Sequence, residues 1–374
     1  MNLAANVSVN LAANEGLADV SNALIYSAMA VYAVAFLAYT AEWIFGSRSR
    51  VGRTAAALDA ERPARAAAAP ATISVAVRKG GSTTVLERPA APEVVTRSTG
   101  PGRPEVPDGP GAAGGDERGD TYGRIAVSLT TLAFLLHFGG VLSRAISVER
   151  GPWGNMYEFS TAFSMVVVAA FLAFLLARKN VRWMGLPLVT TVLLDLGLAV
   201  TVLYTETAQL VPALDSVWMW IHVPLAIVCG GLFYVGAISS ALFLLRDRHE
   251  AALAADPQAR PRGASILERL PSSVTLDKFA YRINAAVFPV WTFTIIAGAI
   301  WAESAWGRYW GWDPKEVWAF ITWVAYACYL HARATAGWKG RKAAYLAIAG
   351  FVCFLVNYYG VNIFFDSLHS YGGV

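Results

Sequence analysis

The chain is organised around residues 301–318, which read W-A-E-S-A-W-G-R-Y-W-G-W-D-P-K-E-V-W and lie between two apolar runs. Such a density of large flat rings is typical of a loop that holds a flat ligand, since indole faces stack and indole N–H groups donate hydrogen bonds. Gly307 and Gly311 alternate with the aromatic residues and let the backbone turn tightly and approach a ligand closely. The loop is therefore the first candidate for a binding site.

The same residues also have a purely structural interpretation. Asp313, Pro314 and Glu316 fit the N-cap, N1 and N3 positions of a helix start. Tryptophan and tyrosine are enriched where membrane helices meet water, so an interfacial belt is the alternative account of the rings. A belt does not require the two glycines, and this favours the binding interpretation.

The composition is that of a membrane protein. The chain has 374 residues, of which 56% are hydrophobic and 15% charged. Apolar windows of about 20 residues recur, and each is long enough to cross a bilayer. The net charge of +4 gives no indication of nucleic-acid binding. Cys229, Cys328 and Cys353 lie in apolar runs without a C-x-x-C spacing, which argues against a disulfide framework, a zinc site and a thioredoxin-like motif.

Basic residues between the apolar runs set the expected orientation. Residues 22–45 form a first span whose C-terminal end is followed at once by arginines, so this end is predicted to be cytoplasmic. Residues 46–121 are rich in Ala, Pro and Gly and predict a disordered cytoplasmic linker. Residues 122–374 supply the remaining spans. We expect an all-α fold with about eight transmembrane helices, N-out and C-out, and with residues 301–318 at the outer face.

Several polar residues outside the loop have structural explanations. Asp195 lies within the fourth predicted span, where a carboxylate is costly, and hydrogen bonding within the bundle is the favoured interpretation. Asn155 and Glu158 follow the second span and fit the N-cap and N3 positions of the next helix. His249 lies among charged residues and is predicted to be a solvated cytoplasmic side chain.

Residues 306–318, W-G-R-Y-W-G-W-D-P-K-E-V-W, resemble the tryptophan-rich WWD signature of the haem-handling proteins that assemble c-type cytochromes. The likeness is greatest to the CcsA/ResC-type, CcsB-like subunit of System II, covers residues 122–374 and includes the N-M-Y-E element at 155–158. It implies haem b as the ligand. Arg308 and Lys315 are the candidate contacts of the haem propionates. The candidate haem-stacking loop comprises Trp306, Gly307, Tyr309, Trp310, Gly311, Trp312, Asp313, Pro314 and Trp318.

The predicted topology brings two histidines to the outer face with the loop. Taken singly, His222 or His369 is more often an ordinary interfacial residue, but two imidazoles beside the loop can ligate one haem iron axially while indoles hold the porphyrin. In the family, one outer histidine precedes the signature, another follows it, and a third lies in the helix just after it. His222, His369 and His331 match these positions. His331 is thus a candidate ligand for a haem within the membrane. His137 is a weaker candidate and is not expected to pair directly with His331.

The resemblance implies a role in cytochrome c biogenesis at the cell membrane. Haem is moved or relayed to the outer face and presented to an apocytochrome bearing C-x-x-C-H, together with a ResB-like membrane partner. The chain is then part of a holocytochrome-c synthase that acts by proximity and orientation, and thiol-reducing proteins contribute indirectly. Two alternatives stay open. One is a haem carrier or exporter without synthase activity, and the other is a membrane subunit that binds a quinone or solute and predicts no haem at His222 and His369.

Overall fold

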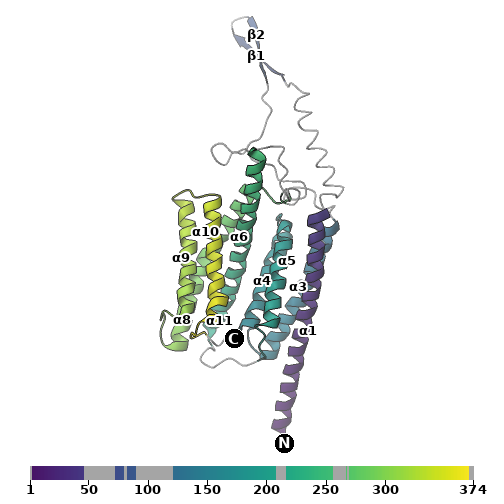
Figure 1. The fold of residues 1–374 in the computed structure, drawn as a ribbon, viewed down its shortest axis with the longest axis vertical. Coiled ribbons are helices and arrows are strands. Elements are labelled where there is room, and N and C mark those ends of the chain that lie inside the picture. Colours follow the sequence, from purple (N-terminus) through teal and green to yellow (C-terminus); the bar gives the residue numbers. More distant parts are fainter. Residues whose placement is uncertain are drawn as a thin grey trace.

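The fold is a bundle of long helices (Figure 1). The computed structural model describes residues 2–45, 72–79, 82–89, 121–207, 216–255, 267 and 269–369. Within them the long helices are α1 (Asn2–Phe45), α3 (Thr121–Val148), α4 (Met156–Leu176), α5 (Gly185–Thr201), α6 (Val217–Ala255), α8 (Ser273–Trp306), α9 (Pro314–Ala334) and α10 (Arg341–Leu355). A 3-10 turn at Arg182–Met184 precedes α5. A π-helical turn at Val356–Gly360 joins α10 to the short α11 (Val361–Phe364).

The described helices confirm a multi-pass membrane protein. In the described part of the chain, seven helical segments are long and apolar enough to cross a membrane. Among the long helices, α9 does not meet this measure, although it packs against α8 and α10. The predicted helical bundle is therefore confirmed, while an eighth crossing by α9 and the side of the membrane on which each end lies stay predictions.

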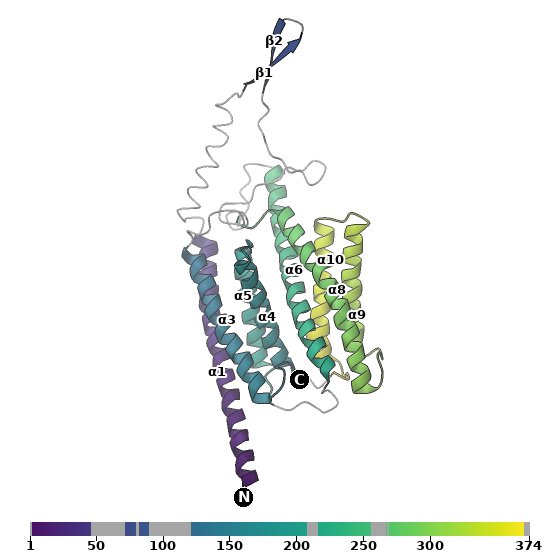
Figure 2. The same ribbon diagram turned by 180° about the vertical axis from the view of Figure 1, so that it is seen from behind.

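A β-hairpin lies within the segment predicted to be a linker. Strands β1 (Thr72–Lys79) and β2 (Ser82–Pro89) pair antiparallel, with Val75 opposite Leu86 in the register. The sequence analysis did not predict this hairpin, which Figure 2 shows beyond one end of the bundle. Most other residues of 46–121 lie outside the described part of the chain, so the linker assignment stays a prediction.

The helices pack as two connected groups (Figures 1 and 2). On one side α1 packs along α3 and α5, and on the other α6 packs along α8 and α10, with α4 between α5 and α6. Helices α1 and α3 approach closely at Gly140, where an added Cβ would lie 2.9 Å from the Ile25 side chain. Ser21 Oγ donates to the Gly140 carbonyl at 2.7 Å and fixes this approach.

Asp195 is held within the bundle, as the structural interpretation predicted. The Ser164 hydroxyl donates to Asp195 Oδ2 at 2.5 Å, and the Tyr359 hydroxyl donates to Asp195 Oδ1. Tyr359 belongs to the π-helical turn, so this carboxylate ties the end of α10 to α4 and α5.

The prediction that His249 is solvated was wrong. Helix α6 continues to Ala255, and His249 is 3% exposed. Its neighbour Glu250 accepts hydrogen bonds from Arg246 Nε at 2.9 Å and from the Ser273 backbone N–H at 3.0 Å. The charged residues that suggested a solvated segment thus pair with one another and fold this part of α6 against the start of α8.

The loop between α8 and α9 lies at the same end of the bundle as residues 365–369 and the N-terminal end of α1 (Figure 1). The predicted placement of both chain ends on the outer side of the membrane stays a prediction. The Trp-rich loop thus lies near residues 365–369, although the hairpin of α9 and α10 separates the two segments in sequence.

Candidate functional site

The Trp-rich loop is shaped by its own capping residues. Helix α8 ends at Gly307, which has a left-handed φ of 69°. Asp313 is the N-cap of α9 and its Oδ1 accepts from the Lys315 backbone N–H at 3.1 Å. Glu316 Oε2 accepts from the backbone N–H groups of Asp313 at 3.0 Å and of Gly311 at 2.8 Å. The predicted cap at Asp313, Pro314 and Glu316 is confirmed, and it holds the loop closed.

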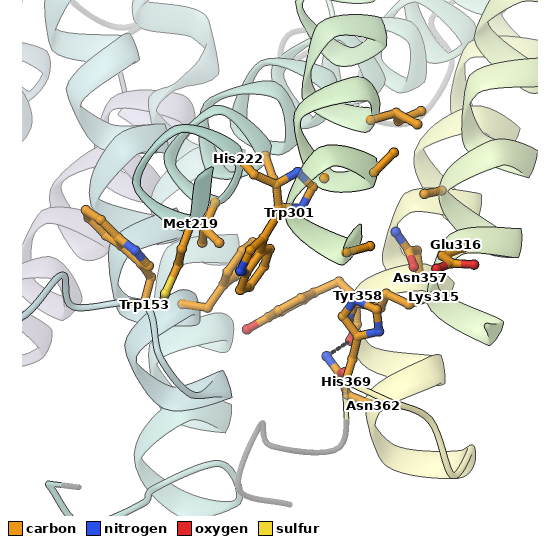
Figure 3. Close-up of a pocket in the computed structure, with 18 of the residues that line it drawn as sticks. Trp153, Met219, His222, Trp301, Lys315, Glu316, Asn357, Tyr358, Asn362 and His369 are labelled. Atoms are coloured by element: carbon orange, nitrogen blue, oxygen red, sulfur yellow. Dashed lines mark hydrogen bonds between the residues drawn. The ribbon is translucent and has the colours of Figure 1, made fainter. Parts of the chain in front are cut away.

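A cavity opens beneath this loop (Figure 3). Its walls come from the segment before α4, from α4, α6, α8, the Trp-rich loop, α9 and α10, and from the π-helical turn, α11 and the C-terminal segment. They are mainly aromatic or small apolar side chains, with a few polar groups among them. The aromatic lining residues are Trp153, Phe159, Trp291, Trp301, Trp306, Tyr309, Trp310, Phe354 and Tyr358.

His222 enters the cavity from α6 in a fixed orientation. Its Nδ1 donates to the Thr294 carbonyl at 2.8 Å, which leaves the lone pair on Nε2. An added Cβ at Gly298 would lie 2.6 Å from the imidazole, so the glycine makes room for the ring. Contacts with α8 thus fix the orientation of the His222 ring, and its Nε2 can coordinate a metal.

His369 enters from the C-terminal segment and is oriented by the loop. Its Nδ1 donates to Asp313 Oδ1 at 3.0 Å, and Asp313 Oδ2 accepts from the Leu368 backbone N–H at 2.8 Å. A carboxylate on Nδ1 fixes the tautomer so that Nε2 carries the acceptor lone pair, as in carboxylate–histidine–metal arrangements.

The electrostatics of the pair favour a neutral imidazole beside an ionised carboxylate. Burial lowers the pKa of His369, and the hydrogen bond to Asp313 opposes this without reversing it. Burial by itself raises the pKa of Asp313, but hydrogen bonds from His369 and from the Leu368 and Lys315 backbones outweigh burial and hold the pKa at about 2. At neutral pH the imidazole is thus ready to bind a metal and the carboxylate is ready to orient it.

Two tryptophans connect the two histidines. The rings of His222 and Trp301 lie 5.9 Å apart, those of Trp301 and Trp306 6.4 Å, and those of Trp306 and His369 4.9 Å, between centroids. Within the residues that the structure describes, the indole nitrogens of Trp301 and Trp291 are buried without a hydrogen-bond partner, and both tryptophans line the cavity. Such donors are costly unless a ligand satisfies them.

The inner side of the cavity is closed by aromatic packing. Trp291 and Phe354 form the floor, with ring centroids 5.8 Å apart. Beneath them Phe233 stacks on Tyr326 at 3.8 Å and 10°, and both side chains are fully buried. Aromatic side chains thus pack tightly below this part of the cavity.

Two imidazoles with Nε2 available, indole and phenyl walls and unsatisfied indole N–H groups fit a planar porphyrin with axial histidines. Among known proteins, the family model described as "Cytochrome C assembly protein" matches residues 127–369. The chain belongs to the cytochrome c assembly protein family. The resemblance seen in the WWD signature is thereby confirmed.

Curated members of the family support the assignment. The protein named "Cytochrome c biogenesis protein CcsA" of Synechococcus sp. (strain JA-3-3Ab) is 36% identical over 297 residues, which cover 67% of this chain and 84% of that protein. The proteins of the same name from a Synechocystis sp. strain and from Trieres chinensis are each 33% identical, and the matches cover 67% of this chain and 87% and 86% of the relatives.

The candidate haem-contacting residues of the Trp-rich loop differ in whether they reach the cavity. Trp306, Tyr309, Trp310 and Lys315 line the cavity. Gly307, Gly311, Asp313 and Pro314 shape the loop, and an added Cβ at Gly311 would collide with the Arg308 guanidinium. Trp312 and Trp318 do not line the cavity. Trp312 is 67% exposed, and its ring meets that of Trp310 edge-on, with the centroids 5.7 Å apart.

The other two candidate haem ligands, His331 and His137, lie outside this cavity. His331 is exposed on the surface of α9, near the end of the helix remote from the loop. His137 is fully buried in α3, where the Tyr32 hydroxyl lies 3.5 Å from its Nδ1. The prediction that they do not form a direct pair agrees with one being buried and the other exposed.

Sequence reasoning missed several lining residues. Trp153 and Asn155 belong to the G-P-W-G-N segment, which the family resemblance had marked but which was interpreted as a helix cap. That cap is present, since Asn155 Oδ1 accepts from the Glu158 backbone N–H at 2.8 Å. Met219 and Asn357 carried no signal, because only helix packing brings them to the site.

Proposed function

We propose that this chain binds haem b in the outer cavity, with His222 and His369 as axial ligands, and presents it for attachment to the C-x-x-C-H motif of apocytochrome c. The observation that carries the proposal is that two histidines, distant in sequence, enter one aromatic cavity with each Nδ1 hydrogen-bonded. The curated relatives are named as cytochrome c biogenesis proteins, which supports this substrate class. The site lies at the outer face of the cell membrane.

The two histidines differ in how firmly they are held. His222 lies within a helix and packs against α8, whereas His369 lies on the segment after α11 and is fixed through Asp313. His369 is therefore the ligand that the histidine of the incoming C-x-x-C-H motif displaces. Each thioether forms when a cysteine S–H adds across a haem vinyl group, with sulfur bonding to one carbon and a proton to the other. The protein contributes orientation and proximity.

A ResB-like membrane partner completes the assembly in this proposal. His331, exposed on α9, is the ligand that this chain offers to haem within the membrane, and the partner supplies the other ligand. The aromatic floor below the cavity favours a relay along the outside of the bundle over passage through its interior. Thiol-reducing proteins act on the apocytochrome and not on this chain.

The chain purified alone or with its partner should carry non-covalent b-type haem in a pyridine haemochrome assay. Co-expression with an apocytochrome bearing C-x-x-C-H should give covalent haem on the cytochrome. Haem on the chain without any covalent product would favour a carrier or exporter over a synthase. Well-folded, haem-free protein with the partner present would contradict the proposal and favour a quinone or solute site.

A further inference from the structure

The outer cavity contains a buried lysine side chain, Lys315, that forms no ion pair within the described part of the chain. Lys315 lines the cavity, and its Nζ lies 5.9 Å from the centroid of the Tyr358 ring. The nearest carboxylates in sequence serve other groups: Asp313 binds His369, and Glu316 holds two backbone N–H groups and lies 3.5 Å from Arg308. Within the described part of the chain, Lys315 forms no ion pair. A basic side chain buried in an aromatic cavity is best satisfied by an anionic ligand group, which can form a charge-assisted hydrogen bond with it.

A buried amide lies on the same wall as this lysine. Asn357 is 8% exposed and lines the cavity, and its side-chain oxygen has no hydrogen-bond partner among the described residues. The π-helical turn Val356–Gly360 carries it, and such turns are frequent at functional sites. The amide can present either its oxygen or its NH₂ group by rotation about the side chain. Figure 3 shows Asn357 and Lys315 together on the wall opposite Trp153.

The other basic residue of the loop, Arg308, contacts the loop itself and not the cavity. The Arg308 guanidinium lies against Gly311, at 3.5 Å from Glu316, and Arg308 is not among the residues that line the cavity. It therefore supports the loop, while Lys315 faces the ligand. Lys315 and Arg308 are a matched pair for mutagenesis, because both are basic residues of segment 301–318 and only Lys315 lines the cavity.

We propose that Lys315 and Asn357 form a carboxylate-binding subsite that takes a propionate of the bound haem. The inference rests on the proposed haem function and names the residues that orient the ligand. Vinyl and propionate groups occupy opposite halves of the porphyrin, so a propionate held at the wall of α9 and the π-helical turn turns the vinyl groups away from it. Lys315 and Asn357 thereby determine which edge of the haem faces the apocytochrome thiols.

The test compares ferric haem b with its dimethyl ester, in which both propionates are uncharged. Purified haem-free protein in detergent is titrated with each, and the dissociation constants are measured from the Soret band. The wild-type chain should bind the diacid at least about tenfold more tightly than the ester, because a charge-assisted hydrogen bond is lost with the ester. Lys315→Gln should remove most of this preference and leave the affinity for the ester nearly unchanged. Asn357→Leu should reduce the preference in part.

Arg308→Gln is the matched control and should keep the wild-type preference. Equal affinity of the wild-type chain for diacid and ester, or an undiminished preference in Lys315→Gln, would overturn the subsite while leaving haem binding itself intact. Failure of both haems to shift the Soret band in wild-type protein of normal helical content would overturn the proposed function and, with it, this inference.

Discussion

Cytochrome maturation should fall strongly in His222→Gly and in His369→Gly, and it should recover in part when imidazole is supplied. Each substitution removes an axial ligand and leaves a cavity the size of the ring, which free imidazole can enter to bind the iron. The loss should exceed the roughly 10–100-fold that removal of a second-shell partner typically costs. Covalent haem on a co-expressed C-x-x-C-H reporter measures the effect.

Two control variants separate ligation from packing in this experiment. His249→Gly removes a buried imidazole from the other end of the same helix, α6, and reports what loss of a packed ring alone does. Trp310→Ala removes an indole that lines the cavity, and imidazole should not rescue it because a small base cannot replace a stacking surface. Normal maturation in both histidine variants would remove the axial-ligand assignment.

Asp313→Asn should weaken haem binding at the outer site by roughly 10–100-fold, the usual cost of losing a carboxylate behind a metal-binding histidine. The carboxylate uses both oxygens, one for His369 and the Lys315 backbone and the other for the Leu368 backbone, whereas asparagine offers a single acceptor oxygen. The ferric Soret titration and the fraction of low-spin haem measure the change. Asp247→Asn, which removes a 2.6 Å ion pair with Arg341 away from the cavity, is the control.

The pH dependence of the Asp313 contribution follows from its pKa of about 2. Since this lies below the value of about 3.9 for an unfolded aspartate, the carboxylate stabilises the fold above that value and the contribution is lost as pH falls toward 2. Asp313 should therefore stay ionised between about pH 5 and 8, and its titration should not change the ligands of the haem iron in that range. A wild-type low-spin fraction in Asp313→Asn would show that His369 does not depend on this contact.

The sequence is most informative where a single residue or a local spacing carries its own signal. Basic residues in the loops predict which end of each membrane span is cytoplasmic. This rule predicted that His222, His369 and the Trp-rich loop lie at one end of the bundle, and in the structure they line one cavity. The cap at Asp313 was predicted from local spacing, but the second role of this carboxylate was not, because the contact with His369 joins segments more than fifty residues apart.

Other features depend on tertiary packing and left no local signal. Trp153, Met219 and Asn357 reach the cavity only because α4, α6 and the π-helical turn converge. His249 was misassigned because charges in its segment pair with one another instead of facing water. The direction of Trp312 could not be predicted either, since its positive φ of 60° turns the chain at that residue.

The coordination of ferric haem in the purified chain tests the central claim most directly. Electron paramagnetic resonance together with near-infrared magnetic circular dichroism distinguishes two histidine nitrogens from other axial ligand pairs. The wild-type protein, loaded at the outer site, should show low-spin iron with two imidazole ligands, and His222→Gly and His369→Gly should each lose this signature and regain it with added imidazole. Low-spin bis-imidazole haem that persists unchanged in both variants would contradict the assignment of the outer cavity as the haem site.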